Sequence, residues 1–163
     1  MEGLLARCAK LRALQTEPLA WTLENHSGPW RLHLALEGRG RALGEDVLEV
    51  QEVLDPQEVL RGPDADRAFD GLRGLEVNGG WGEARVLTRF SRMGAVLRRL
   101  SEEEGLQVTA QMGLGEVRLH LPGLGEAAAD QQIERLRELR QMLEPLGARL
   151  EPRAVRARTH LDL

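Results

Sequence analysis

The sequence contains 163 residues, of which 22 are basic and 26 acidic, so its formal net charge is −4. A chain of this length buries roughly 70% of its unfolded surface, and we expect a single α+β domain over residues 1–163. The acidic balance argues against nucleic-acid binding through bulk charge, and no apolar run approaches the about 18 residues of a membrane span. The N-terminus lacks the apolar core of a signal peptide, and the single Cys8 cannot form an internal disulfide, so we expect a cytoplasmic protein.

The first half of the chain alternates between helical and strand-like periods. We predict a helix over residues 2–15, a strand over 30–37, a helix over 43–54, a short helix over 56–60 and a helix over 64–72. The short helix rests on Asp55 and Pro56, because aspartate is a common N-cap and proline suits the first helical position. The glycines and asparagine of residues 78–80 predict a turn.

The second half is more regular. We predict a strand over residues 83–90, a helix capped by Ser91 and ended by Gly105, strands over 106–112 and 116–121, a helix that Gly147 ends, and a strand over 148–155. The order strand, helix, strand, strand, helix, strand is that of the ferredoxin-like split unit. The sequence therefore predicts an α+β fold, with an antiparallel sheet, helices on one face and a ferredoxin-like (βαββαβ) second half.

The stretch MGLGEVRLHLPG, residues 112–123, raises the question of a nucleotide-binding glycine loop. A dinucleotide fingerprint needs a third glycine and a following helix, but Arg118 occupies that position and a strand follows. A phosphate loop also needs the amide groups of a helix N-terminus. We therefore predict that Gly113 and Gly115 form the corner of a β-hairpin.

Other catalytic or metal-binding motifs are absent from the sequence. The four histidines, His26, His33, His120 and His160, do not have metal-ligand spacing, and Cys8 has no second cysteine nearby. No serine lies in a nucleophile-elbow motif. We predict no metal site.

One set of polar residues does share a predicted face of the sheet. These residues alternate with the apolar ones along four strands, and they are Arg31, His33, Arg85, Arg89, Gln107, Thr109, Gln111, Arg118 and His120, with Glu37, Glu83 and Glu116 nearby. Such a face can bind an anionic ligand or lie against another domain. The alternative interpretation is the solvated outer face of an antiparallel sheet.

Long stretches of the sequence resemble a known family. EARVLTRFSRMGAVLRRLSEEEGLQVTAQMGLGEVRLHLP, IERLRELRQMLEPLGARLEPRAVR, EPLAWTLEN and WRLHLALEGRGRALGEDVLEV are similar to the C-terminal, or cap, domain of the FAD-binding E subunit of glycolate oxidase, a vanillyl-alcohol-oxidase-type FAD-linked oxidase. The family's N-terminal FAD domain and its usual tail have no counterpart in these residues. The resemblance implies a domain that caps a flavin held mainly by a partner domain or chain.

The resemblance further implies a component of an oxidoreductase that acts on a 2-hydroxy acid together with other oxidase subunits, and that is not catalytic alone. On the predicted polar face, Arg85, Arg118, His120 and His33 are the candidates to face substrate or flavin: an arginine to hold a carboxylate, a histidine to take the hydroxyl proton. No catalytic or FAD-binding residue is carried over from the family. The alternatives are a stand-alone ferredoxin-like binding or assembly module, which could be a homo-oligomer without redox activity, and a folded remnant with no retained ligand.

Overall fold

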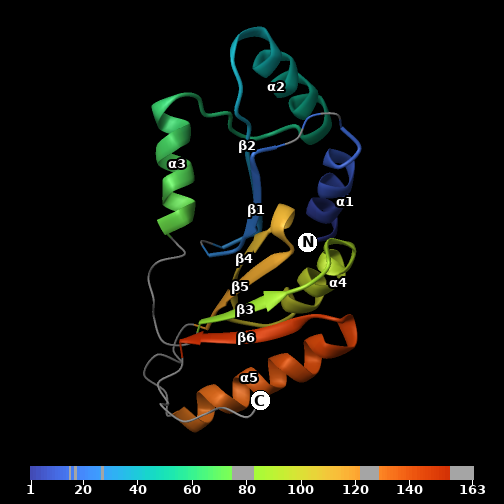
Figure 1. The fold of residues 1–163 in the computed structure, drawn as a ribbon, viewed down its shortest axis with the longest axis vertical. Helices are drawn as coiled ribbons and strands as arrows, with labels where there is room; N and C mark the ends of the chain where they lie inside the picture. Colours follow the sequence, from blue (N-terminus) through green and yellow to red (C-terminus); the bar gives the residue numbers. More distant parts are fainter. Residues whose placement is uncertain (15, 17, 27, 75–82, 122–128, 155–163) are drawn as a thin grey trace. The chain divides into compact units, whose positions relative to one another are not determined.

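A computed structural model describes residues 1–14, 16, 18–26, 28–74, 83–121 and 129–154 (Figure 1). Its elements are α1 (Glu2–Leu11), β1 (Ala20–Glu24), β2 (Arg31–Ala35), α2 (Gly40–Leu54), α3 (Pro63–Gly74), β3 (Glu83–Leu87), α4 (Phe90–Leu100), β4 (Gln107–Gln111), β5 (Glu116–His120), α5 (Ala129–Leu143) and β6 (Arg149–Ala154). Short 3₁₀ turns, η1 (Met112–Leu114) and η2 (Glu144–Leu146), follow β4 and α5. The predicted α+β class is confirmed. The turn predicted at 78–80 and His160 lie outside the described residues.

The strands form one six-stranded sheet in the order β2-β1-β4-β5-β3-β6. The pairs β1–β4, β4–β5, β5–β3 and β3–β6 are all antiparallel. The six elements predicted from residue 83 onward are therefore present in the predicted order. β1 was not predicted as a strand, and it adds to the sheet beside β4.

The chain divides into two compact units. Unit 1 comprises Met1, Thr22–Leu32 and Gly79–Leu163, and unit 2 comprises Glu2–Trp21 and His33–Asn78. Most of the sheet, with α4 and α5, belongs to unit 1. Unit 2 contains α1, α2 and α3.

The core of unit 1 is built from alternate strand residues and the apolar stripes of two helices. Fully or almost fully buried side chains are Leu23, Val86, Val108, Ala110, Val117, Leu119, Met93, Val96, Leu97, Leu100, Leu136, Leu139 and Leu143. Burial of one such aliphatic side chain contributes about 1.5–3 kcal/mol. Because these residues occupy one face of each strand, the opposite face carries the polar residues.

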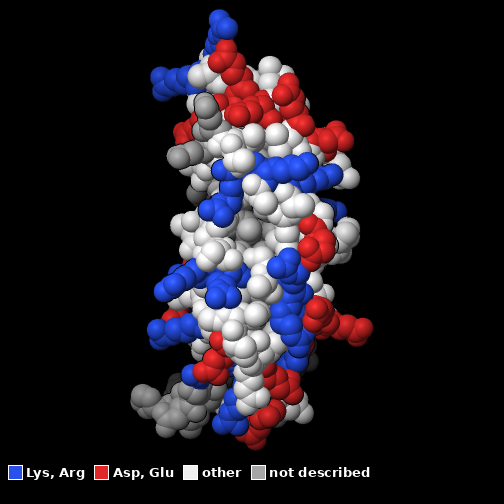
Figure 2. All heavy atoms as spheres, turned by 90° about the vertical axis from the view of Figure 1, so that its right-hand side faces the viewer, with Lys and Arg blue, Asp and Glu red and all other residues white. Residues whose placement is uncertain are grey.

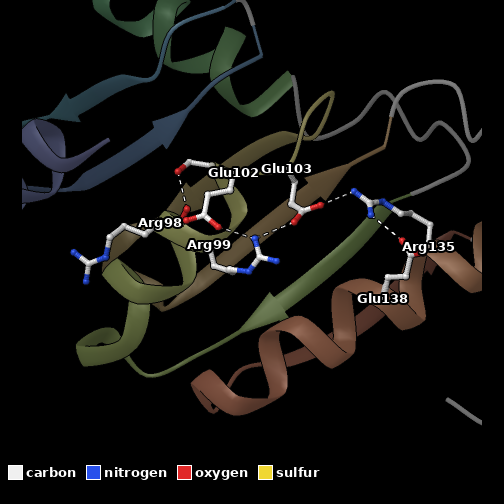
Figure 3. A network of polar contacts seen from close by, with 7 residues as sticks. Arg98, Arg99, Glu102, Glu103, Arg135 and Glu138 are labelled. Atoms are coloured by element: carbon white, nitrogen blue, oxygen red, sulfur yellow. Dashed lines mark hydrogen bonds and ion pairs between the residues drawn. The ribbon is translucent and has the colours of Figure 1, made fainter.

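An ion-pair network joins the end of α4 to α5 (Figure 3). Glu103 follows α4 and pairs with Arg99 at 3.1 Å and with Arg135 of α5 at 2.8 Å. Arg135 also pairs with Glu138 at 2.8 Å, and these partners raise its pKa further although burial opposes them. Glu103 is thus partly buried between two elements, whereas its neighbours Glu102 and Glu104 are exposed.

In unit 2, α1 packs against α2 through the buried residues Cys8, Leu11, Val50 and Leu54. The buried Thr16 hydroxyl lies 3.1 Å from Asp46 Oδ1 and 2.5 Å from Glu49 Oε2. A hydroxyl carries one proton, so it donates to one of these carboxylates at a time. These contacts fix the segment after α1 to the side of α2.

Two predicted helix starts are wrong. Asp55 does not begin a helix: it ends α2 in the left-handed conformation (φ 48°), and its N–H donates to the carbonyl of Gln51. Residues 56–60 are not helical. Pro56 prevents α2 from continuing, and the residues after it have no apolar stripe that would stabilise a new helix by burial. Ser91 is not the cap of α4, which begins at Phe90 after Arg89.

The hairpin predicted at residues 112–115 is confirmed. Met112–Leu114 form a 3₁₀ turn, Gly115 has φ 68°, and β4 pairs with β5 on either side. A Cβ at Gly115 would lie only 2.5 Å from the carbonyl oxygen of Thr88. This glycine is therefore required both by its φ angle and by close packing, and a strand rather than a helix follows it.

None of the helices in the described part of the chain is long and apolar enough to cross a membrane. Basic and acidic side chains are interspersed on the face that Figure 2 draws.

Candidate functional site

The polar face of the sheet in unit 1 is organised in rows that cross the strands. The strand register places one row as Glu24, Thr109, Arg118, Arg85 and Glu151, a second as Thr22, Gln111, Glu116, Leu87 and Arg149, and a third as Gln107, His120 and Glu83. Residues opposite one another on antiparallel strands have side chains on the same face. The sequence-predicted polar residues of β3, β4 and β5 are therefore brought together.

Several polar residues on this sheet face are buried rather than exposed to solvent. Thr22, Glu24, Thr109 and Glu116 lie on it and are all at least nine-tenths buried. Buried polar groups need partners, since an unsatisfied one costs about 1–3 kcal/mol. The contacts of Glu116 and Thr109 show how these requirements are met.

Glu116 holds two arginines at once. Its Oε2 lies 2.6 Å from Arg85 Nη2, and its Oε1 accepts a hydrogen bond of 2.9 Å from Arg118 Nε. Burial alone would raise the pKa of Glu116, but the hydrogen bonds and charges of Arg118 and Arg85 outweigh it and lower that pKa below its ordinary value. The carboxylate therefore stays ionised and fixes both guanidinium groups.

The two arginines are directly opposite each other in the register of β3 and β5. Like charges in this position repel, and the carboxylate of Glu116, which contacts both guanidinium groups, offsets this repulsion. The side chains of Arg85 and Arg118 are 29% and 39% exposed, whereas that of Glu116 is 8% exposed. A ligand that reaches this face thus meets the guanidinium groups before the carboxylate.

Arg85 has an unused donor. Its Nε is buried and makes no hydrogen bond to any residue that the structure describes. The Nε and one terminal nitrogen of an arginine form a planar edge that matches a carboxylate. Since Glu116 occupies a terminal nitrogen, the Nε end of this edge is left without an acceptor.

A histidine that the sequence did not single out belongs to the same face. His26 follows β1, and its Nε2 lies 2.6 Å from the hydroxyl oxygen of Thr109, while its backbone N–H donates to Glu24 at 2.7 Å. The Asn25 side chain holds this turn against β4 through bonds to the carbonyl of Leu106 (3.0 Å) and the N–H of Val108 (2.7 Å). The position of His26 is therefore fixed by the sheet.

The environment of His26 favours its neutral form. Burial lowers its pKa and the nearby His120 adds to this, which together outweigh the opposite influence of Glu24 and of a hydrogen bond with Gln107. A neutral imidazole can accept a proton, which is the role that general-base catalysis requires.

The four sequence-predicted candidates do not share one unit. Arg85 lies on β3, and Arg118 and His120 lie on β5, all in unit 1. His33 lies on β2 and belongs to unit 2.

Sequence reasoning missed Glu24 and His26, and it gave Glu116 only a place near the face. Thr22, Glu24 and His26 are spaced two residues apart, as Arg118 and His120 are, and this period of two was the available signal. It was weak because Leu23 supplies the only fully buried apolar residue of β1.

Among the described residues, no group of three or more histidine, cysteine, aspartate or glutamate side chains is placed to hold a metal ion. The comparisons found no match for the chain among protein-family models, curated proteins or solved structures.

Proposed function

We propose that this chain is the substrate-side domain or subunit of an FAD-linked oxidoreductase that acts on a 2-hydroxy acid. One observation carries the proposal: two partly exposed arginines, Arg85 and Arg118, are fixed side by side by a buried carboxylate on an otherwise polar sheet face. Fixed guanidinium groups are the usual means by which proteins bind carboxylates. The sequence resemblance to the cap domain of glycolate oxidase supplies the reaction class.

In this proposal the residues of the chain have separate roles. Arg85 and Arg118 bind and orient the substrate carboxylate. His120 or His26 accepts the proton of the substrate hydroxyl, for which a neutral imidazole is required. The flavin, when bound, accepts the hydride.

The residues of this chain fit a flavin that is held mainly by another domain or chain. The glycine turn at residues 112–115 is a hairpin and not a phosphate cradle, so it offers no pyrophosphate site. The polar face instead offers groups suited to a small carboxylate. We therefore propose a partner domain or chain that binds most of the FAD, and no catalysis by this chain alone.

We also propose that the second half is ferredoxin-like. The support is the element order β3, α4, β4, β5, α5, β6 together with the strand order β4-β5-β3-β6. In such a unit the helices cover one face of the sheet, so the arginine pair would lie on the opposite face.

The test is to purify the tagged chain from cells that co-express its neighbouring reading frames. We expect a complex that contains flavin, recognised by its visible absorbance, and that oxidises glycolate or a related 2-hydroxy acid with a dye as electron acceptor. Arg85→Ala and Arg118→Ala should each reduce kcat/KM about 100-fold, as expected for loss of roughly 2.7 kcal/mol of charge-assisted binding.

Arg137→Ala is the matched control, because Arg137 is an exposed arginine on α5. Flavin-containing complexes whose turnover is unchanged in both arginine variants would remove the pair from the site. A chain that binds carboxylates but never a flavin partner would support a stand-alone binding module in place of an oxidase component.

A further inference from the structure

Helix α2 of unit 2 has an inner face that is buried and an outer face that is exposed. The inner residues Val50 and Leu54 pack toward α1, whereas Leu48, on the opposite side of the helix, is 60% exposed. We propose that the outer face of α2 binds the α2 of a second copy of this chain in antiparallel orientation, so that the chain forms a weak dimer. This inference is independent of the proposed carboxylate site.

The outer face of α2 combines exposed apolar groups with charges at both ends. Residues three and four apart share one side of a helix, and on this side they are Arg41, Gly44, Glu45, Leu48, Gln51 and Glu52. A shallow hollow of about 490 Å³ lies along this face, and Arg61 lines it from the segment that follows the helix. Val59 and Leu60, which precede Arg61, are 42% and 41% exposed. Exposed apolar side chains that lie together are typical of interaction sites.

Gly44 is not required by the fold of the chain that carries it. It lies inside α2, where glycine is less stable than alanine. Its φ is not positive, and an added Cβ would meet no atom within 4 Å. A residue without a side chain does, however, let a second helix approach closely. Leu48 of one copy can therefore pack on Gly44 of the other.

The charges of α2 oppose its own helix dipole. The dipole favours acidic residues in the first turn and basic residues in the last, but α2 has neither. Instead, Arg41 lies in the first turn and Glu52 in the last. Arg41 pairs with Glu45 at 2.7 Å, but these side chains are 92% and 62% exposed, so the pair contributes little. The arrangement is unfavourable in a single helix, and an antiparallel second helix reverses this.

An antiparallel pair of α2 helices brings opposite charges together. When Leu48 lies opposite Gly44 of the second copy, Arg41 comes next to Glu52 of that copy, because the residue numbers run in opposite directions along the two helices. Twofold symmetry forms this contact twice. Each Arg41 then lies near the negative end of the other helix, and each Glu52 near the positive end. The outer face is therefore complementary to itself.

The charge balance of the outer face also suits a second copy. Arg41 and Arg61 supply two positive charges, and Glu45 and Glu52 supply two negative ones. The other two carboxylates of α2 contact Thr16 instead, on another side of the helix. A helix of 15 residues is only about 22 Å long, so the interface is small. We therefore expect a Kd of roughly 10–100 μM.

The experiment measures self-association of the whole purified chain by sedimentation equilibrium over a range of concentrations. In Gly44→Gln the Kd should rise at least about tenfold, because the added side chain holds the two helices apart. The melting temperature of the same variant should be equal to or higher than that of the wild-type chain, since glutamine favours helix and the space around Gly44 is open. Damage to the helix would instead lower both stability and association.

Charge reversals test the antiparallel orientation. Arg41→Glu and Glu52→Arg should each raise the Kd about tenfold, because like charges then meet twice in each dimer. The double variant, and an equimolar mixture of the two single variants, should dimerise as the wild-type chain does. The two reversals change the net charge in opposite directions, so net charge cannot explain a weaker dimer in both. Arg67→Glu, at an exposed position on α3, is the matched control and should leave the Kd unchanged.

Each contrary outcome contradicts a defined part of the proposal. A wild-type chain that is still monomeric at about 500 μM would overturn the second copy as the occupant and would leave the face to another protein. A dimer whose Kd is the same in Gly44→Gln and Arg41→Glu would overturn the role of α2. Failure of the double variant to recover the dimer would overturn the antiparallel orientation. None of these outcomes changes the carboxylate site, which flavin content and turnover test separately.

Discussion

Single residues on the polar face are held by partners that come from different strands. Glu116 contacts Arg118 on its own strand and Arg85 on the next, and His26 contacts Thr109 across the sheet. Each of these contacts joins a buried oxygen or nitrogen to a charged or hydrogen-bonding partner. Side chains held by such contacts at the centre of the face are suited to binding a small ligand in one orientation.

Gly115 gives the clearest prediction for a single residue. Its φ is 68°, and an added Cβ would approach the carbonyl oxygen of Thr88 to 2.5 Å. Gly115→Ala must therefore bear both backbone strain and a clash with backbone, so we expect a loss of about 2–4 kcal/mol in the free energy of unfolding. Urea denaturation followed by circular dichroism measures this loss.

Gly105→Ala is the control that separates strain from clash. Gly105 has φ 71° but no atom within 4 Å of its added Cβ. This variant should lose only about 1 kcal/mol, the cost of the left-handed conformation for alanine. Equal losses in the two variants would contradict the close packing of Gly115 against Thr88.

For helices and strands, the predictions from sequence were most accurate where the spacing of apolar residues and the turn-forming residues indicated the same structure. β4, its glycine turn and β5 have alternating apolar residues on both sides of Gly115, and all three were predicted in place. β1 was missed because Thr22 and Glu24 are polar but buried, and their burial depends on partners distant in sequence. The helix start predicted at Asp55 was wrong because aspartate can occupy either end of a helix, and here it ends α2.

Glu103 connects α4 to α5 through ion pairs, and its replacement should lower the stability of the chain. Glu103 is partly buried and pairs with Arg99 and Arg135 (Figure 3). Glu103→Gln should lower the free energy of unfolding by about 0.5–1 kcal/mol at low salt and by less in 1 M salt, because screening weakens ion pairs. The measurement is chemical denaturation at both salt concentrations.

Glu104→Gln is the matched control, because Glu104 is the exposed neighbour in the same acidic run. It should change the free energy of unfolding by no more than about 0.5 kcal/mol. A loss in Glu103→Gln that is the same at both salt concentrations would show that packing, and not the ion pairs, is responsible.

For the whole molecule, the candidate site could be predicted only in part. Alternation along each strand placed Arg85, Arg118 and His120 on the polar side, and the structure agrees. The bridge from Glu116 to Arg85 depends on the register between β3 and β5, which no local pattern contains. The division into units also lies beyond local patterns, and it assigns His33 to a different unit from the other three candidates.

The polar face makes the stability of the molecule depend on pH in one direction. Folding lowers the pKa of His26 from 6.5 and that of Glu116 from 4.5, so in both cases the unfolded chain binds protons more readily. For these two groups, stability therefore rises with pH over the range in which the folded and unfolded states differ in bound protons. These contributions are complete above about pH 6.5, and they are lost on acidification, first that of His26 and then, below about pH 4.5, that of Glu116.

Two variants assign the loss of stability to these groups. In His26→Gln the free energy of unfolding should change less between pH 7 and pH 5 than in the wild-type chain, and in Glu116→Gln the change below about pH 4.5 should become smaller. Urea denaturation at a series of pH values measures both, and His33→Gln in unit 2 controls for the loss of a histidine. A wild-type chain that gains stability on acidification from pH 7 would contradict the lowered pKa values, because protons would then bind the folded state more tightly.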